Sequence, residues 1–302
     1  MAHSEVETLP EVLEQPDVYD RNAHRHEKAV AEILDTFHKA FRPCENEQQQ
    51  YIDVGCGPGG FTKGYLLPRC LPCRRLVAVD KSAAMLRFAA EKYPHPKIDY
   101  LPLDISQDVD EFVDRQGQFQ RVYSFLTLHW VRDQGSAIRN IENLMAAGGE
   151  CILLFKTSSH FFHLFAAMMN SPRWEKYSQV LKNLVPESAY LSDVGTLRTY
   201  AKELVRYTNL TPLACEVFLP PQELHWNTET MTESLLSFNP VYSLLNDEER
   251  EDLRKYIRDF AAPVCIDSFN QRPSNRMLIF IHAYKEHSAA NTATCATAVK
   301  LN

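Results

Sequence analysis

Residues 53–60 read Asp-Val-Gly-Cys-Gly-Pro-Gly-Gly and hold four of the ten glycines in the 302-residue chain. Average usage of about 7% would give roughly 21 glycines, so the rest of the sequence is poor in glycine. An apolar run at 51–54 precedes the stretch and a helical pattern at 61–67 follows it, which predicts a turn between a strand and a helix. Because glycine lets backbone approach a ligand closely, this turn predicts a nucleotide-type pocket in an open α/β sheet.

The same alternation of strand and helix continues through the first half of the chain. Further strands are predicted at 76–80, 98–103, 121–125 and 151–156. Helices are predicted at 20–42, 82–93 and 136–146, with Ser82 as an N-cap and Gly148 and Gly149 closing the last of them. Strands that alternate with helices in this way predict βαβ units and a mainly parallel sheet.

The second half has a different character. Helices are predicted at 160–170, 172–184, 194–208 and 246–261, and strands near 214–219 and 277–284. Asn246 and Glu249 have the spacing of a helix N-terminus. We therefore predict an α/β fold: a doubly wound, mainly parallel, seven-stranded Rossmann-like sheet with an inserted helical cap.

The expected organisation is a single domain with a leading segment and a tail. An N-terminal helical segment is predicted over 1–45 and the ligand-binding core over 46–158. The helical cap and the C-terminal part of the same domain follow over 159–286, and the Ala- and Thr-rich stretch 287–302 is expected to be a flexible tail.

Composition limits the class of protein. The formal net charge is −7, so no overall positive field favours nucleic acid or an anionic membrane surface. No apolar run approaches the roughly 18 to 20 residues needed to cross a bilayer, and the first ten residues lack an apolar signal segment. We expect a cytoplasmic protein with no obligate protein partner. The eight cysteines are expected to be reduced thiols, and Cys70 and Cys73 lack the further ligands of a metal site.

Two ligand classes fit the glycine turn. Gly55, Gly57 and Gly60 match the GxGxxG fingerprint of dinucleotide-binding enzymes, with Asp80 in the place of the ribose-binding carboxylate. Asp53 argues against that class, because it places a negative charge beside the diphosphate. A sulfonium amino acid is cationic and is attracted by the same carboxylate.

The run 53–60 resembles the first motif of the class I S-adenosylmethionine-dependent methyltransferases, and acidic residues at the next two strand ends agree with it. The resemblance implies S-adenosyl-L-methionine as cofactor, with Asp53 at the methionine end, Asp80 on the ribose hydroxyls and Asp104 with Ile105 at the adenine. Each carboxylate taken singly also suits a helix cap or a solvated turn. The implied cofactor-binding residues are Asp53, Gly55, Gly57, Gly59, Asp80, Lys81, Asp104, Ile105 and Phe125.

The segment that follows the fourth strand, 124–134, reads Ser-Phe-Leu-Thr-Leu-His-Trp-Val-Arg-Asp-Gln. It lacks the Asn/Asp-Pro-Pro-Tyr motif of amide and adenine methyltransferases. It resembles the juvenile hormone acid O-methyltransferases of insects and, more distantly, trans-aconitate methyltransferases. The resemblance implies that Trp130 donates its indole N–H to an acceptor carboxylate and that His129 adds a second contact. Both side chains also suit a packed core.

Carboxylate methylation needs no general base, since a carboxylate is already ionised at pH 7. The segment from Phe161 to Tyr177 is rich in aromatic residues and Met, and Phe161 and Phe165 are candidates to cover the apolar tail of a sesquiterpenoid such as juvenile hormone acid or farnesoic acid. An amphipathic helix packed on the sheet explains the pattern equally well. A Gln in the family's first helix aligns with Arg25 or, one residue later, with His26, so the sequence departs from the family pattern here. Arg25 remains a candidate to bind the acceptor carboxylate through a bidentate pair. The alternatives that stay open are another small molecule, a polar acid such as aconitate, and a non-catalytic cofactor- or lipid-binding relative.

Overall fold

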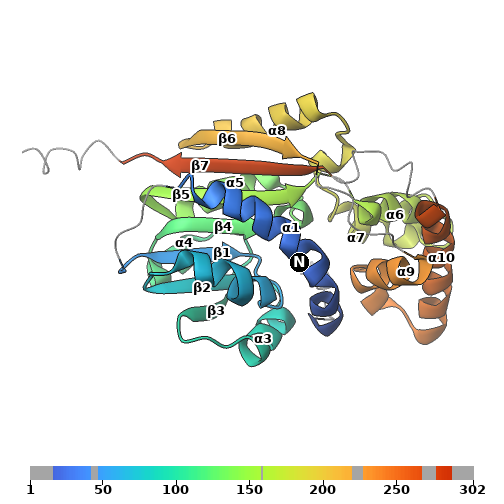
Figure 1. The fold of residues 1–302 in the computed structure, drawn as a ribbon. Coiled ribbons are helices and arrows are strands. Elements are labelled where there is room, and N and C mark those ends of the chain that lie inside the picture. The colour runs from blue at the N-terminus through green and yellow to red at the C-terminus, as the bar shows by residue number, and fades with distance from the viewer. Residues whose placement is uncertain (1–15, 42–46, 158, 220–226, 267–276, 288–302) are drawn as a thin grey trace, which may run out of the picture.

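The computed structural model describes residues 16–41, 47–157, 159–219, 227–266 and 277–287. Its centre is a seven-stranded sheet of order β3-β2-β1-β4-β5-β7-β6 (Figure 1). Only β7 runs antiparallel to its neighbours, which confirms the predicted doubly wound, mainly parallel sheet. The strands are β1 (Gln50–Val54), β2 (Arg75–Asp80), β3 (Ile98–Pro102), β4 (Phe119–Phe125), β5 (Met145–Lys156), β6 (Leu210–Phe218) and β7 (Leu278–Lys285).

The strand order reverses between β1 and β4, and the glycine turn lies at this reversal. Ile52 pairs with Val77 of β2 on one side and with Val122 of β4 on the other. Every residue of β1 is buried, so an apolar strand at the centre of the sheet leads directly into the turn. Ligands of open α/β sheets bind at such a switch point, beyond the carboxyl ends of the strands.

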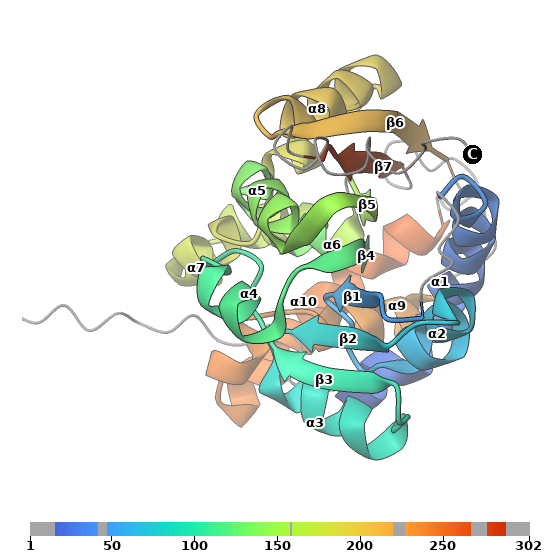
Figure 2. The ribbon, with the colours of Figure 1, turned by 90° about the vertical axis from the view of Figure 1, so that its left-hand side faces the viewer.

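Helices cover both faces of the sheet (Figure 2). One hydrophobic core joins the sheet to α4 (Asp110–Gln116), α5 (Gln134–Leu144) and α8 (Val194–Arg206). A second core on the opposite face joins it to α1 (Pro16–His38), α2 (Leu67–Cys70), α3 (Ala83–Lys92) and the π-helical turn η1 (Thr62–Leu66). Helices α1 and α3 therefore lie on the same face of the sheet, the face that packs in the second core.

The cap lies beyond one end of the sheet and has a hydrophobic core of its own (Figure 1). It is built from two insertions, one after β5 and one between β6 and β7. The first contains α6 (His160–Met169), η3 (Glu175–Tyr177), α7 (Ser178–Lys182) and η4 (Glu187–Tyr190), and the second contains α9 (Thr228–Ser237), η5 (Tyr242–Leu244) and α10 (Asp247–Ile266). Phe162, Phe165 and Trp174 from the first insertion pack against Leu235 and Leu253 from the second.

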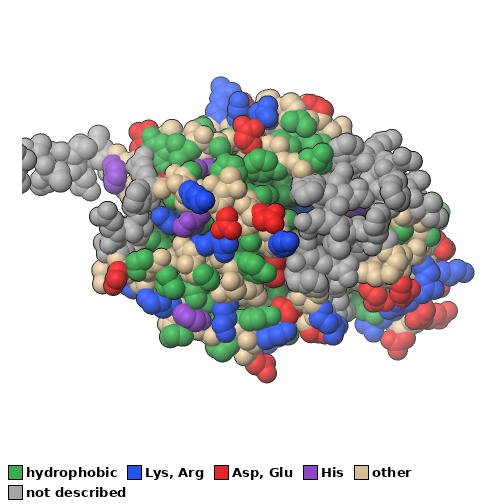
Figure 3. Space-filling model, in the orientation of Figure 1, with side chains coloured by type: hydrophobic (Ala, Val, Ile, Leu, Met, Phe, Trp, Pro, Cys, Tyr) green, Lys and Arg blue, Asp and Glu red, His purple; other side chains and the backbone are tan. Residues whose placement is uncertain are grey.

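Charged side chains of both signs are interspersed on the face that Figure 3 shows, including the α9 and α10 end of the cap. There Arg254 pairs with Glu229 and Glu233, and Arg258 pairs with Glu229. These pairs join two helices of one insertion. Among the described helices, none is long and apolar enough to cross a membrane.

Several local predictions are confirmed and others are wrong. The Ser82 side chain accepts a hydrogen bond from the Met85 backbone N–H, as an N-cap does. Asn246 and Glu249 cap each other reciprocally, at 2.9 and 3.3 Å. The helix predicted at 136–146 ends instead at Leu144, and Gly148 and Gly149 lie within β5 rather than closing a helix.

The helix predicted at 172–184 forms only the short η3 and α7, and the predictions missed α4 and α9. The tail predicted over 287–302 lies, apart from His287, outside the described residues.

Candidate functional site

The glycine turn is held against the ends of two strands. The backbone N–H groups of Gly55 and Cys56 donate to the Val79 carbonyl of β2 at 2.7 and 2.9 Å. Gly55, Gly57 and Gly59 all have positive φ, between 54° and 84°. A Cβ on Gly55 would lie 2.1 Å from the Thr127 hydroxyl oxygen. The turn therefore needs glycine both for its conformation and for its contact with the end of β4.

Asp80, at the end of β2, shapes the turn directly. One carboxylate oxygen accepts the Gly57 backbone N–H at 2.9 Å, and the other accepts the Ser82 N–H at 2.9 Å. An ionised carboxylate has about four acceptor positions, so these two donors do not exhaust it. The side chain is half-buried beside the turn, where it can both fix the backbone and accept from a hydroxyl group.

Asp53 lies beneath the turn and is 3% exposed. Burial raises its pKa from 3.8 to about 7, and the nearby charge of Asp80 acts in the same direction. The Thr62 hydroxyl donates to the carboxylate at 2.7 Å and partly offsets this rise. Sequence reasoning missed Thr62, although a hydroxyl residue at the start of the following helix was a visible signal.

The third predicted carboxylate is engaged locally. Asp104 accepts from the Ser106 backbone N–H at 2.9 Å and from its hydroxyl at 2.7 Å, so it caps its own turn. Ile105 is 5% exposed and packs in the sheet core. Lys81 is exposed. Phe125 is buried, with its ring 5.3 Å from that of Phe61.

The end of β4 carries a strained residue that the sequence did not reveal. Leu126 has a φ of 54°, in the region that favours glycine, and its N–H donates to the Leu154 carbonyl of β5 at 2.7 Å. The neighbouring Thr127 hydroxyl donates to the Gly55 carbonyl at 3.1 Å. Strained backbone held by its surroundings is concentrated at functional sites. Here it directs the chain from β4 into the short helix η2 (Leu128–Trp130).

Trp130 belongs to an aromatic cluster that joins four helices. Its ring stacks on Phe238 of the turn after α9, at 5.8 Å and 15°, and contacts Phe161 of α6 at 5.8 Å. Trp130 is half-buried, and its indole N–H has no hydrogen-bond acceptor within the part of the chain that the structure describes. The members of the aromatic cluster are Tyr19, Trp130, Phe161, Phe162 and Phe238.

Two other predicted acceptor residues lie deeper. His129 is 4% exposed, with its ring 5.2 Å from Trp130. Phe165 is fully buried in the cap core, 6.3 Å from Phe162, and has no exposed surface beside Trp130. The structure thus brings Trp130 and Phe161 together and places Phe165 behind them.

Helix α1 covers the glycine turn. The Tyr19 ring would lie 3.8 Å from a Cβ on Gly57, and it contacts Phe238 of the cap at 5.2 Å. Burial raises the pKa of Tyr19 to about 12, and the negative charges of Asp80 and Glu27 contribute. Sequence reasoning missed Tyr19. Arg25 lies in the same helix, but its side chain is outside the described part of the structure.

A salt bridge fixes α1 to α3. The Asp20 carboxylate pairs with Lys92 at 2.7 Å and accepts the Tyr93 hydroxyl at 3.0 Å. These contacts hold the helix that carries Tyr19 over the turn.

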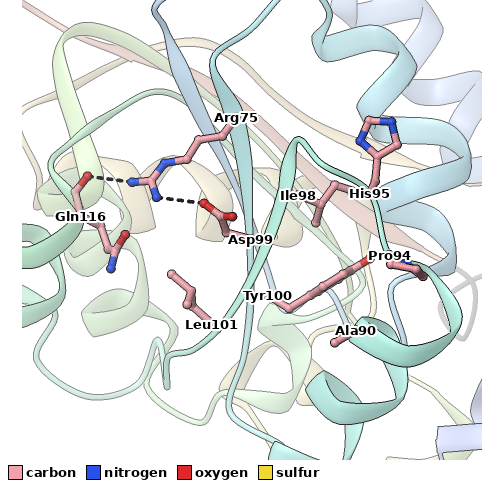
Figure 4. Close-up of a pocket in the computed structure, with 9 residues that line it drawn as sticks. All are labelled: Arg75, Ala90, Pro94, His95, Ile98, Asp99, Tyr100, Leu101 and Gln116. Atoms are coloured by element: carbon pink, nitrogen blue, oxygen red, sulfur yellow. Dashed lines mark hydrogen bonds and ion pairs between the residues drawn. The ribbon is translucent and has the colours of Figure 1, made fainter.

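A separate hollow of about 530 Å³ lies at the outer edge of the sheet, along β3 (Figure 4). Arg75 crosses it, pairing with Asp99 at 2.9 Å and donating to the Gln116 carbonyl at 3.2 Å. None of the predicted site residues lines this hollow. The predicted site residues Asp53, Asp80 and Trp130 lie instead at or just beyond the carboxyl ends of β1, β2 and β4.

Comparison with known proteins agrees with this arrangement. Residues 52–153 match a family described as a methyltransferase domain. Juvenile hormone acid O-methyltransferase of Bombyx mori is 28% identical over 210 residues, 68% of this chain and 72% of that protein. The enzyme of the same name from Drosophila melanogaster is 28% identical over 290 residues, 90% of each chain. The fold is similar to that of a chain in the solved complex between the Haloferax volcanii Trm112 methyltransferase activator and a methyltransferase. The TM-score is 0.50 and the sequence identity is 12%, and the match covers 90% of this chain and 98% of that chain.

Proposed function

Because this chain is a class I S-adenosylmethionine-dependent methyltransferase, we propose that it methylates the carboxylate of a small, apolar acid. The observation that carries the proposal is Trp130, whose half-buried indole N–H lies within the aromatic cluster without an acceptor among the described residues. An indole offers an apolar surface with a single hydrogen-bond donor, which suits a carboxylate attached to an apolar tail. Juvenile hormone acid and farnesoic acid have this chemistry, and the names of the two insect relatives support them as candidates.

The donors and acceptors at the turn fit S-adenosyl-L-methionine. Asp53 supplies buried negative charge for a cationic amino acid, the glycines at 55, 57 and 59 leave room for backbone approach, and Asp80 supplies acceptors for ribose hydroxyls. We assign Asp104 and Ile105 to the adenine, with Lys81 and Phe125 beside the cofactor. When bound, the cofactor supplies an electrophilic methyl group on a positively charged sulfur.

The task of the protein is then to orient the acceptor and exclude water. The acceptor carboxylate is already ionised, so no side chain needs to remove a proton. The Trp130 N–H orients it, His129 gives a second contact, and the rings of Phe161 and Phe238 keep water from the reacting atoms.

A panel of free acids from farnesoate to aconitate, with labelled cofactor and mass detection of the methyl ester, tests this function. We expect ester from farnesoate and no product from farnesol. Trp130→Phe keeps the ring and removes the donor, so it is expected to lower kcat/KM by about 10- to 100-fold, as for a hydrogen bond to a charged group.

Trp174→Phe is the matched control, because it removes an indole from the cap core whose ring contacts Tyr177 and Tyr256, which are not members of the aromatic cluster. It is expected to lower the unfolding temperature and to leave turnover below that temperature unchanged. Unchanged esterification by Trp130→Phe would remove Trp130 from the acceptor site. Turnover of aconitate alone would favour a polar acid, and cofactor binding without ester from any acid would favour a non-catalytic relative.

Asp53 predicts that cofactor affinity depends on pH. Its pKa of about 7 in the folded protein lies above the ordinary value of 3.8, so the folded state loses stability as the pH rises between these two values. A cation beside the carboxylate favours its ionised form, so cofactor affinity should increase as the pH rises through about 7. The increase in unfolding temperature on adding cofactor should be larger at pH 8 than at pH 6. Asp53→Asn should abolish this difference, and a pH-independent increase in the wild type would contradict the assignment.

A further inference from the structure

Lys156 is the last residue of β5, at the same edge of the sheet as the glycine turn. Two residues earlier, the Leu154 carbonyl accepts the N–H of the strained Leu126. Side chains alternate along a strand, and Ile152 and Leu154 lie in the core that faces α1. The Lys156 side chain therefore projects on the face of the sheet that α1 covers. Strand β5 ends where the cap begins (Figure 1).

No residue in the described part of the chain supplies a counter-charge to the ammonium group of Lys156. The ammonium makes no ion pair or hydrogen bond with any residue that the structure describes. Its register partner on β7 is the apolar Leu278, and Leu154, two residues earlier on the same face of β5, pairs with Phe125 of β4. Burial alone lowers its pKa to about 8, so at neutral pH it still carries most of its charge. A charge placed in apolar surroundings without a partner is costly, which is typical of a functional site rather than a structural one.

A second polar group without a partner among the described residues follows three positions later in the sequence. Ser159 is 5% exposed, and its hydroxyl oxygen has no hydrogen-bond partner among the described residues. Ser159 occupies the N-cap position of α6, yet its side chain makes no capping bond to that ten-residue helix. The N-terminus of a helix carries partial positive charge. Lys156, Ser159 and the start of α6 at His160 thus place three anion-binding features within five residues.

The same helix connects this group to the aromatic cluster. Phe161 and Phe162, in the first turn of α6, contact Trp130 at 5.8 and 5.9 Å. Burial and the charges of His163 and Lys156 lower the pKa of His160 to about 4, so His160 is neutral at pH 7. Lys156 is then the charged group that this segment offers to an anion, with the exposed His163 further along the helix.

We infer that Lys156 and Ser159 form the subsite that selects a carboxylate as the methyl acceptor, at the start of the helix whose Phe161 and Phe162 contact Trp130. The inference rests on the proposed function and deepens it, because it gives the acceptor carboxylate a counter-charge that Trp130 cannot supply.

The chemistry predicts which kinetic constant this subsite controls. A lone pair of the carboxylate oxygen forms the new bond to the methyl carbon, and the carbon–sulfur bond breaks with its electron pair moving to sulfur. The negative charge of the acid and the positive charge of the sulfonium disappear together. Lys156 therefore stabilises the bound acid more than the transition state or the neutral ester, so it acts on acid binding and ester release rather than on the chemical step.

Lys156→Met tests the inference in the full-length protein at saturating cofactor. We expect KM for farnesoate to rise about 10- to 100-fold, as for the loss of a charged hydrogen bond, while kcat does not fall, because the bound acid loses more stabilisation than the transition state. Ser159→Ala should raise KM in the same direction by a smaller factor. Lys156→Arg keeps the charge and should recover most of the affinity.

Two controls separate this role from a structural one. Lys182→Met removes an exposed lysine of α7 and should change neither constant. In equilibrium binding with S-adenosylhomocysteine present, the wild type should prefer farnesoate to its methyl ester, and Lys156→Met should lose that preference. The variant should unfold at the same temperature as the wild type or higher, since it no longer buries an unpaired charge.

The possible outcomes distinguish failure of the Lys156 and Ser159 subsite from failure of the proposed function. If the wild type forms ester but both KM and the preference for acid over ester are unchanged in Lys156→Met and Ser159→Ala, the subsite is wrong and the proposed function stands. If the wild type forms no ester from any acid, the proposed function is overturned and the subsite with it.

Discussion

Replacing Gly55 by alanine is expected to destabilise the folded protein by about 2 to 5 kcal/mol, combining the cost of positive φ for an L-residue with overpacking of a tight site. The new Cβ would lie 2.1 Å from the Thr127 hydroxyl oxygen and 2.6 Å from its Cβ, at a φ of 79°. The turn and the end of β4 cannot both keep their positions. Cofactor affinity should therefore fall together with stability, measured by chemical unfolding and by calorimetric titration.

Gly64 provides the matched control for this substitution. It lies in η1, nine residues further along, and a Cβ there would meet no atom within 4 Å. Gly64→Ala is expected to be neutral or to stabilise by up to about 1 kcal/mol, because alanine loses less backbone freedom on folding. Equal effects of the two substitutions would show that the contact with Thr127 does not constrain the turn.

Asp80→Ala is expected to weaken cofactor binding by about 2 to 4 kcal/mol, roughly 30- to 1,000-fold, because hydrogen bonds to a charged group contribute about 1.5 to 3 kcal/mol each. The carboxylate has a second role besides the proposed contact with the ribose. It also accepts the backbone N–H groups of Gly57 and Ser82, so its removal loosens the turn as well. Titration of the folded variant with cofactor measures the loss.

Two further variants, Asp80→Asn and Asp99→Ala, separate the effect of the Asp80 charge from the effect of losing an aspartate elsewhere in the sheet. The amide keeps one acceptor and the size of the side chain, so Asp80→Asn should lose less affinity than Asp80→Ala. Asp99, on the neighbouring strand, pairs with Arg75 at the outer edge of the sheet, and its removal should leave affinity within about twofold, as for an exposed ion pair. If Asp80→Ala bound cofactor as tightly as the wild type, the ribose assignment would be incorrect.

The sheet could be predicted from the sequence because its strands contain short apolar runs that alternate with helical patterns, and because β1 leads into Gly55 and β2 ends at Asp80. Helix α9 could not. It reads Thr-Glu-Thr-Met-Thr-Glu-Ser-Leu-Leu-Ser, in which β-branched and hydroxyl residues have weak helix propensity, and it is helical because Met231 and Leu235 pack in the cap core. Helix α4 buries only Phe112 and has too short a pattern to recognise. Gly148 and Gly149 indicated a helix end, but pairing with β4 extends β5 back through both residues to Met145.

At the site, the proximity of Asp53 and Asp80 followed from the parallel strands, whose carboxyl ends share one edge. The roles of Tyr19, Thr127 and Lys156 could not be predicted in the same way. Tyr19 reaches Gly57 only because α1 crosses the face of the sheet, and Thr127 meets Gly55 across 72 positions of sequence. In the sequence, Lys156 is an ordinary lysine at the end of a strand, and only the structure shows that no described residue pairs with it.

The two insertions of the cap leave the sheet at the same edge, since β5 and β6 are both antiparallel to the β7 between them. One insertion carries Phe161 and the other Phe238, while the glycine turn belongs to neither. Changes in length or sequence within an insertion can therefore alter the proposed acceptor site without altering the glycine turn. Exchange of either segment between related enzymes is a route to new acceptor range on an unchanged scaffold.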